Sequence, residues 1–464
     1  MSVDASVRED PADQAGSVRT IRPLGRPLQG SIRVPGDKSL SHRAVLFGAM
    51  AEGTTRVSGV LDSQDVRSSV AAVTALGAKA DLAVQPDGSL AGTVEGWGSA
   101  GPRQPDGPID CGNSGTTARL LMGVIAPWDV EVTLTGDSSL QSRPMRRITA
   151  PLMKMGAEFF PAGREHLPLT ERGCASLAPL HYESPMASAQ LKSAILLAGI
   201  YAHGETSVVE PAPSRNHTEL MLPQFGVPTM DGEREAAVTG PATPRACALD
   251  VPGDPSSAAF LVCAALLKPE SAVEITDVSL NPTRIGFART LERMGADVSV
   301  SVVKHVGKEP VGTITARFTA RLRGCEVPAS KIASIVDEIP VLSLVAAHAA
   351  GITVFRQVGE LRVKETDRLR AVIEGLALMG VDAWEEGDDL FIEGQPGLHP
   401  PAGLSFDTGG DHRLAMTWYL AGEAFGVDVE LDDSDCVCVS WPDFFADMES
   451  LQRRGATLPL TLDD

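Results

Sequence analysis

The chain has 464 residues, of which 43% are hydrophobic and 22% are charged, and its formal net charge is -20. This composition is typical of a soluble globular protein with room for two or more domains, and it excludes a disordered or fibrous chain. The surplus of acidic residues disfavours nucleic acid and anionic membranes as partners. An anionic ligand would therefore need a local cluster of cations.

The first residues, "MSVDASVREDPADQAGSV", are acidic and contain no apolar core, so we do not expect them to act as a signal peptide. We expect a disordered tail over residues 1–17. The longest apolar run, "AAFLVCAALL", is too short to span a bilayer. Seven scattered cysteines favour a reducing compartment, and we expect a cytoplasmic protein. We interpret Cys436 and Cys438 as two residues on one face of a strand rather than as a metal site.

A repeat runs through the chain. Six times, a segment with helical periodicity ends in a long side chain, followed by Gly, then Ala or Val, then a strand-like run. Each glycine fits a helix C-cap, and their near-even spacing favours a repeated unit over coincidence. These glycines are Gly77, Gly156, Gly226, Gly295, Gly380 and Gly455.

Each interval also contains a second helix that is apolar nearly all round and opens with a short polar loop. These segments are "GDKSLSHRAVLFGAMA", "GNSGTTARLLMGVIA", "SPMASAQLKSAILLAGIYA", "GDPSSAAFLVCAALL", "DEIPVLSLVAAHAAG" and "GGDHRLAMTWYLAGEAFG". Such helices belong in the interior, whereas amphipathic helices such as "RPMRRITAPLMKM" belong outside. The pattern predicts an α/β protein of two similar domains, each with three units of inner buried helices and outer sheets and helices.

Cations stand where these inner helices begin: Lys38, Arg43, Arg119 and Arg413. Helix N-termini favour anions, so the pattern indicates a small ligand with phosphate and carboxylate groups. It is not a P-loop, because Asp37 separates Gly36 from Lys38.

Eight fragments occur in order over roughly residues 20 to 450: "PGDKSLSHRA", "CGNSGTTARLL", "LTGDSSLQSRPM", "ASAQLKSAILLAG", "SRNHTE", "DEIP", "ELRVKETDRL" and "GGDHRLAM". Together they resemble the 5-enolpyruvylshikimate-3-phosphate synthase family, in its divergent bacterial branch. The resemblance implies the enolpyruvyl transferase fold, an inside-out α/β barrel whose chain crosses twice between the domains. The first domain would hold residues 37–252, and the second would hold residues 18–36 with 253–464.

The resemblance also implies transfer of the enolpyruvyl group of phosphoenolpyruvate to the 5-hydroxyl of shikimate 3-phosphate, through a tetrahedral intermediate. Its proton transfers would fall to Lys38, Asp337 and Glu365. Taken without the family, Asp337 reads as a helix cap and Glu365 as the partner of Arg368 three residues on.

The ligand sets carried over by motif are as follows. For shikimate 3-phosphate they are Lys38, Ser39, Arg43, Ser188, Ala189 through its backbone, Gln190, Arg215, Asp337 and Lys364. For phosphoenolpyruvate they are Lys38, Gly115, Arg143, Gln190, Arg368 and Arg413. His217 and His412 have no evident proton to move and are expected to be structural. We expect no metal, no cofactor and a monomer.

Two points about the family pattern and two alternative functions remain open. Val439 stands where some family members carry a lysine. Gly115 does not obstruct the site of glyphosate, a competitor of phosphoenolpyruvate, but the divergent motifs leave sensitivity open. A related enzyme that uses UDP-N-acetylglucosamine shares the fold, although its reactive cysteine has no counterpart in "GDSSLQSRPM". A non-catalytic protein that binds anionic metabolites is the other alternative, which the presence of Lys38, Asp337 and Glu365 disfavours.

Overall fold

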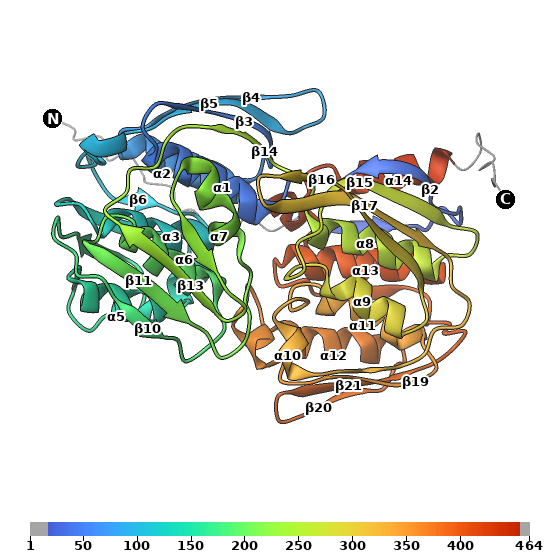
Figure 1. Cartoon of the computed structure of the whole chain (residues 1–464). Coiled ribbons are helices and arrows are strands. Elements are labelled where there is room, and N and C mark those ends of the chain that lie inside the picture. The colour runs from blue at the N-terminus through green and yellow to red at the C-terminus, as the bar shows by residue number, and fades with distance from the viewer. Residues whose placement is uncertain (1–16, 455–464) are drawn as a thin grey trace, which may run out of the picture.

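The computed structural model describes residues 17–454 and has two lobes that lie side by side (Figure 1). The first lobe is drawn from blue to green and the second from yellow to red, with a blue segment from the start of the chain added to the second lobe. Within the described residues the strands form five four-stranded sheets and one three-stranded sheet, three sheets in each lobe. The predicted α/β fold of six units is confirmed.

The elements of the first lobe have the following bounds. Its strands are β3 (Thr54–Val60), β4 (Lys79–Val84), β5 (Leu90–Glu95), β6 (Ile109–Asp110), β7 (Glu131–Thr135), β8 (Glu158–Phe160), β9 (Leu169–Arg172), β10 (His181–Glu183), β11 (Gly204–Val209), β12 (Thr229–Asp231), β13 (Glu235–Gly240) and β14 (Ala248–Asp250). Its helices are α1 (Lys38–Met50), α2 (Gln64–Ala75), α3 (Gly115–Ile125), α4 (Ser138–Ser142), α5 (Arg146–Met155), α6 (Ala189–Gly199) and α7 (His217–Met221), with 3-10 turns η1 (Gly98–Ala100) and η2 (Leu222–Phe225).

The elements of the second lobe include two strands from the start of the chain. The strands are β1 (Arg19–Ile21), β2 (Gln29–Arg33), β15 (Ala272–Ser279), β16 (Asp297–Val306), β17 (Glu309–Arg317), β18 (Glu326–Val327), β19 (Gly351–Phe355), β20 (Ala383–Glu386), β21 (Asp389–Gly394), β22 (Leu404–Phe406) and β23 (Val429–Leu431). The helices are α8 (Pro255–Leu267), α9 (Gly286–Arg293), α10 (Ala329–Ile332), α11 (Ile339–His348), α12 (Arg368–Leu378), α13 (His412–Phe425) and α14 (Phe444–Arg454), with 3-10 turns η3 (Gly359–Val363) and η4 (Asp435–Val439).

Each unit is built around a parallel pair of strands. In the second unit, β6 pairs in parallel with β7 with Ile109 opposite Leu134, and the inner helix α3 connects the two strands. A hairpin then adds antiparallel strands, giving the order β6-β7-β9-β8.

Two units exchange their first strand between the lobes. Strand β2 precedes α1 in the chain but pairs with β15 of the second lobe, and β14 precedes α8 but pairs with β3 of the first lobe. The two crossing segments touch each other through a bridge between Gly36 and Gly253. A Cβ atom at Gly36 would lie 2.0 Å from the carbonyl oxygen of Gly59, so this crossing requires glycine.

The inner helices are buried almost all round, as their sequences predict. All 13 residues of α8 are buried. Most residues of the other inner helices are buried as well, in α1, α3, α6, α11 and α13. In the second lobe, Figure 1 shows α8, α11 and α13 enclosed between the sheets. Buried apolar side chains form two separate clusters: one spans residues 40–251, and the other joins residues 21–34 to residues 258–451. Each fully buried large apolar side chain contributes about 1.5–3 kcal/mol to stability.

The predicted turns at glycine are confirmed at the five positions that lie within the described residues. Gly77, Gly156, Gly295 and Gly380 follow outer helices with positive φ, as glycines at helix C-termini do, and Gly226 follows the 3-10 turn η2 with positive φ. Gly455 lies outside the described residues. The third unit departs from the pattern, because α7 is buried on all sides instead of amphipathic. It packs between α1 and β17, a strand of the other lobe.

The interpretation of Cys436 and Cys438 as strand neighbours is wrong. Both lie in the 3-10 turn η4, where Cys436 is buried and Cys438 is exposed. The carboxylate of Asp433 accepts hydrogen bonds from the backbone N–H groups of Asp435 and Cys436, and this local bonding favours a turn over a strand.

The expected tail over residues 1–17 lies outside the described residues except for Ser17. The Ser17 hydroxyl donates to the Asp435 carboxylate at 2.6 Å, so this residue is anchored. In the described part of the chain, no helix has the length and apolar character needed to cross a membrane.

Candidate active site

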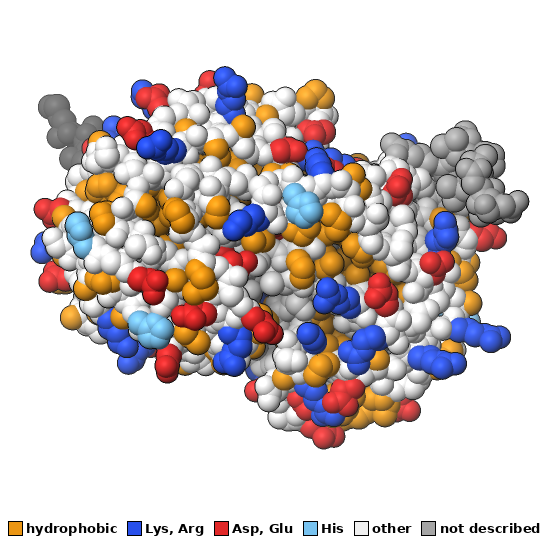
Figure 2. Space-filling view, in the orientation of Figure 1, with side chains coloured by type: hydrophobic (Ala, Val, Ile, Leu, Met, Phe, Trp, Pro, Cys, Tyr) orange, Lys and Arg blue, Asp and Glu red, His pale blue; other side chains and the backbone are white. Residues whose placement is uncertain are grey.

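A cleft between the lobes receives the N-terminal ends of all six inner helices. Nine Lys and Arg side chains and five Asp and Glu side chains line it, a local cationic surplus in a strongly acidic protein. On the outer face drawn in Figure 2, by contrast, basic and acidic side chains are interspersed over both lobes. The cleft is therefore the place where an anionic ligand would be attracted.

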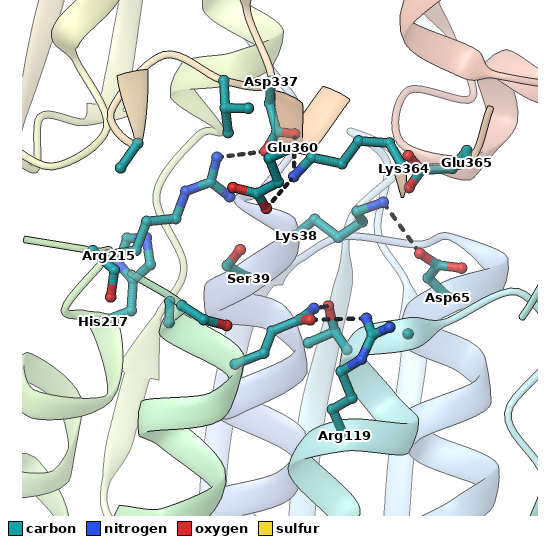
Figure 3. Close-up of a pocket in the computed structure, with 18 of the residues that line it drawn as sticks. Lys38, Ser39, Asp65, Arg119, Arg215, His217, Asp337, Glu360, Lys364 and Glu365 are labelled. Atoms are coloured by element: carbon teal, nitrogen blue, oxygen red, sulfur yellow. Dashed lines mark hydrogen bonds and ion pairs between the residues drawn. The ribbon is translucent and has the colours of Figure 1, made fainter. Parts of the chain in front are cut away.

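The start of α1 supplies Lys38, Ser39 and Arg43. Asp37 caps this helix by accepting from the N–H of Leu40 at 2.8 Å. The Lys38 ammonium lies 3.1 Å from the carboxylate of Asp65 on α2 (Figure 3). Arg43 is buried and donates to the hydroxyls of Thr218 and Ser193 at 2.8 Å each, so its guanidinium is held rigidly at the floor of the cleft.

The start of α3 brings Gly115 against two guanidinium groups. A Cβ atom at Gly115 would lie 2.7 Å from Nη1 of Arg119 and 3.5 Å from Nη1 of Arg143. Arg143 is fixed in turn by Asn113, whose side-chain oxygen accepts at 2.7 Å. Burial, then the neighbouring Arg147 and Arg143, lowers the pKa of Arg119 to about 9. A bound anion would relieve this repulsion.

Helix α6 begins at the cleft with Ser188 as its N-cap, followed by Ala189 and Gln190. The Gln190 side chain bridges to the neighbouring helix: its oxygen accepts from Arg119 at 2.9 Å and its amide donates to Thr116 at 3.0 Å. Three residues predicted from one motif therefore lie together at a helix N-terminus, where phosphate is favoured.

Asp337 lies on the opposite wall, just before α11, and faces four cations. Arg368 Nη1 is 3.2 Å, Lys364 Nζ is 3.7 Å and Arg413 Nη2 is 3.8 Å from its carboxylate, and Arg215 of the first lobe forms an ion pair with it (Figure 3). Burial alone would raise the pKa of Asp337, but these cations outweigh burial and hold it well below its ordinary value. Asp337 is not the N-cap of α11, a position that Glu338 occupies.

Glu365 precedes α12 and pairs with Arg368 at 2.6 Å. The pairing read from the sequence is present, but it is not within a helix, because α12 begins at Arg368 itself. Burial opposes ionisation of Glu365, yet its cationic surroundings, chiefly Arg368, hold its pKa well below the ordinary value.

Arg368 is the predicted ligand that does not line the cleft. It is buried behind Asp337 and Glu365, and its Nε donates to Asp411 at 2.7 Å. Its guanidinium is thus shared among three carboxylates, which suits it to hold both cleft carboxylates in place. The other predicted site residues all line the cleft.

Both histidines set aside as structural also line the cleft. His217 is buried, and its Nε2 lies 3.1 Å from Arg284. Burial and the nearby Lys38 and Arg413 hold the pKa of His412 well below its ordinary value, so its ring is neutral at pH 7.

Sequence reasoning missed five charged residues of the cleft: Asp65, Arg147, Asp254, Arg284 and Glu360. Arg284 is fully buried and pairs with Asp37 at 2.7 Å and Asp254 at 2.8 Å, tying together the two segments that cross between the lobes. Glu360 pairs with Lys364 at 3.0 Å. Arg119 was recognised as a helix-entrance cation but not assigned to a ligand. Two of the missed residues had a usable signal: Glu360 lies in "ELRVKETDRL", and Asp254 lies in the loop that opens "GDPSSAAFLVCAALL".

Comparison with known proteins identifies the family. The sequence profile of EPSP synthase (3-phosphoshikimate 1-carboxyvinyltransferase) matches residues 24–448. A 3-phosphoshikimate 1-carboxyvinyltransferase of Rhodospirillum rubrum is 44% identical over 439 residues, covering 94% of this chain and 96% of the relative. Another, of Rhodopseudomonas palustris, is 46% identical over 432 residues, covering 91% and 95%.

Solved structures agree. The EPSP synthase of Acinetobacter baumannii superposes with a TM-score of 0.82 at 37% identity, covering 93% of this chain and 97% of that one. The enolpyruvyl transferase NikO from Streptomyces tendae, at 19% identity and a TM-score of 0.73, shares the fold, covering 94% and 98%. The chain belongs to the EPSP synthase (3-phosphoshikimate 1-carboxyvinyltransferase) family.

Proposed function

We propose that this chain transfers the enolpyruvyl group of phosphoenolpyruvate to the 5-hydroxyl of shikimate 3-phosphate and releases phosphate. The observation that carries the proposal is the cleft itself, where cations from both lobes surround two ionised carboxylates, Asp337 and Glu365. Two substrates that each carry phosphate and carboxylate groups match this surplus of positive charge.

The first lobe would hold most of shikimate 3-phosphate. Ser188 and Gln190 at the start of α6, with Arg215, offer donors to its phosphate, and Ser39 and Arg43 stand at the start of α1. From the second lobe, Asp337 would accept from a hydroxyl of the ring and Lys364 would offer a cation. Binding would therefore use both walls of the cleft.

Phosphoenolpyruvate would lie between Arg143, Gly115 and Gln190 on one side and Arg413 on the other, with Lys38 within reach of both substrates. Guanidinium groups match carboxylate and phosphate oxygens in pairs, which fixes orientation as well as charge. Arg368 would contribute to phosphoenolpyruvate binding indirectly, because its ion pairs hold the carboxylates of Asp337 and Glu365 in place.

The chemistry would proceed by addition and elimination. In the addition, the 5-hydroxyl oxygen bonds to C2 of phosphoenolpyruvate, loses its proton, and C3 gains one; in the elimination, C3 gives up a proton and the C–O bond to phosphate breaks. Lys38, Asp337 and Glu365 are the groups placed to move these protons. Because both carboxylates are ionised, each can accept a proton in one step and return it in the next.

We propose further that the first domain comprises residues 37–252 and the second residues 18–36 with 253–464, which the two separate apolar clusters support.

A monomer suffices for activity, since one chain supplies every predicted site residue. A cytoplasmic location is supported by the seven cysteines, all described and none in a disulfide.

The test is to mix the purified protein with phosphoenolpyruvate and follow phosphate release with either shikimate 3-phosphate or UDP-N-acetylglucosamine as acceptor. Release that depends on shikimate 3-phosphate is the expected result. Release only with the nucleotide sugar, or with neither acceptor, would overturn the proposal.

A further inference from the structure

A buried charge cluster lies beneath the first-lobe wall of the cleft. Lys192 projects from α6, and its ammonium nitrogen lies 2.8 Å from the carboxylate of Glu210 and 2.7 Å from that of Glu219. All three side chains are buried, and none of them lines the cleft. Buried charges are expensive unless they are paired, so a cluster of this kind requires an explanation.

Glu210 connects the cluster to the site. One of its carboxylate oxygens accepts from the backbone N–H of Ser188 at 2.8 Å, at the point where α6 begins. The other accepts from the hydroxyl of Ser214 at 2.9 Å, in the residue before Arg215. A single carboxylate therefore joins the two cleft-lining segments that carry Ser188 and Arg215.

Lys192 is the counter-ion of this carboxylate. Burial disfavours the ammonium form, but Glu219 and Glu210 outweigh burial and raise the pKa of Lys192 above its ordinary value. A charged carboxylate accepts stronger hydrogen bonds than a neutral carboxyl or an amide, and it presents acceptors on both oxygens. An amide in place of the Glu210 carboxylate would therefore hold the two segments less firmly.

We infer that Glu210, with Lys192 as its counter-ion, is a positioning residue that fixes Ser188 and Arg215 for shikimate 3-phosphate. The inference rests on the proposed function, because it takes these two residues as ligands of that substrate. Glu210 itself touches no substrate; it acts through the N-terminus of α6 and the loop before α7.

Glu219 offers a matched control within the same cluster. It is equally buried and contacts the same ammonium group, but among the described residues its carboxylate makes no hydrogen bond to a cleft-lining side chain or backbone. Burial, the main cause, raises the pKa of Glu219, so a neutral amide is a mild replacement there. Removing Glu219 also leaves Lys192 and Glu210 as a balanced pair.

The experiment compares Glu210→Gln with Glu219→Gln. Calorimetry gives the Kd of shikimate 3-phosphate alone, steady-state kinetics give the KM of each substrate, and thermal unfolding reports folding. We expect Glu210→Gln to raise the Kd of shikimate 3-phosphate about tenfold or more, equivalent to about 1.4 kcal/mol. We expect the KM of phosphoenolpyruvate to stay within about threefold, and Glu219→Gln to leave the Kd within about threefold of wild type.

Ser214→Ala is the second variant, because it removes one of the two hydrogen bonds and leaves every charge of the cluster in place. We expect a smaller rise in the Kd of shikimate 3-phosphate, about two- to fivefold, in a protein that unfolds at the wild-type temperature. If Glu210→Gln does not fold, this variant decides the question, and an unchanged Kd overturns the inference.

Three results would contradict the inference: an unchanged Kd in Glu210→Gln, an equal rise in Glu219→Gln, or an equal rise in the KM of phosphoenolpyruvate. The last two would indicate a general loss of structure. Failure of the proposed function is seen separately, since wild-type protein would then release no phosphate in the presence of shikimate 3-phosphate.

Discussion

Arg215 and Asp337 form an ion pair that spans the cleft, from the loop before α7 in the first lobe to the start of α11 in the second. Next to it, the side-chain amide of Asn281 donates to Asn216 at 2.9 Å, again between the lobes. The carboxylate proposed to take part in the chemistry is thus also the one that joins the two walls.

Replacement of Asp337 by Asn keeps the shape of the side chain but removes its charge and its ability to take a proton. We expect kcat to fall by about 10²- to 10⁴-fold, the usual range for a group in acid–base catalysis. The measurement is phosphate release at saturating substrates. Asp389→Asn, a change in an ion pair at the surface of the same lobe, is the control and should leave kcat unchanged. A kcat within about threefold of wild type in Asp337→Asn would remove this residue from the proton transfers.

Lys38→Met retains the aliphatic stem and removes the ammonium group. We expect activity to fall by several orders of magnitude, about 10³-fold or more, because the variant loses both a proton carrier and a contact to both substrates. Lys79→Met is the matched control, since Lys79 also pairs with a carboxylate at 3.1 Å but lies at the surface. Circular dichroism should show both variants folded. Retention of about a tenth of wild-type turnover, a cost near 1.4 kcal/mol, would exclude Lys38 from catalysis.

Arg413→Lys and Glu365→Gln separate binding from proton transfer. A lysine replaces a planar fork by a point charge, so Arg413→Lys should mainly raise the KM of phosphoenolpyruvate, by about tenfold. Glu365→Gln should mainly lower kcat, because the amide accepts no proton. Initial rates over a grid of both substrates give the two parameters, and the opposite assignment of effects would mean that the two roles are exchanged.

Much of the site follows from local sequence. Helix α6 shows why: an apolar segment after the cap Ser188 predicts a buried helix, and buried helices must begin at an edge of the core. The meeting of all six N-termini at one cleft is implied by the family resemblance, because burial alone does not fix the direction in which a helix runs. The glycine after each outer helix is likewise predictable, because it needs only the φ of one residue.

The remaining contacts depend on segments that are far apart in the chain. Arg284 lies at the centre of the crossing only because β2 and β14 are exchanged between the lobes, and an isolated arginine in a loop gives no periodic signal. The sequence predicts Arg368 as a ligand of phosphoenolpyruvate in the cleft. In the structure its guanidinium is buried behind the cleft, where it pairs with Asp411 of another segment. The turn at Cys436 depends on two hydrogen bonds that the Asp433 side chain accepts from the backbone, and this local bonding competes with strand propensity.

Gly115→Ala tests the crowding at the start of α3. The new methyl group would lie 2.7 Å from Arg119 Nη1, so this flexible side-chain end must move while the backbone keeps its place. We expect the KM of phosphoenolpyruvate to rise by about three- to thirtyfold, about 0.7–2 kcal/mol, with little change in stability. Gly107→Ala is the control, since a Cβ atom there meets nothing within 4 Å. An equal KM in both variants would show that phosphoenolpyruvate does not bind against the start of α3.

Glu171 on β9 predicts how stability depends on pH. It is buried opposite Val132 and Phe159, and neither of its carboxylate oxygens has a hydrogen-bond partner among the described residues. Burial raises the pKa of Glu171 well above its ordinary value. The folded protein therefore binds this proton more tightly than the unfolded chain does. Its contribution to stability is complete below the unfolded pKa, about 4.3, and is lost as the pH rises from there towards the folded pKa.

Glu171→Gln removes the titration, so the variant should be more stable than wild type at pH 8, by about 1–3 kcal/mol, and close to wild type at pH 4.5. Urea unfolding at a series of pH values measures this difference. Glu158→Gln, an exposed change on the neighbouring strand β8, should follow the wild-type curve throughout. Parallel curves for wild type and Glu171→Gln would mean that Glu171 binds its proton equally in the folded and unfolded states, and that burial at this position carries no electrostatic cost.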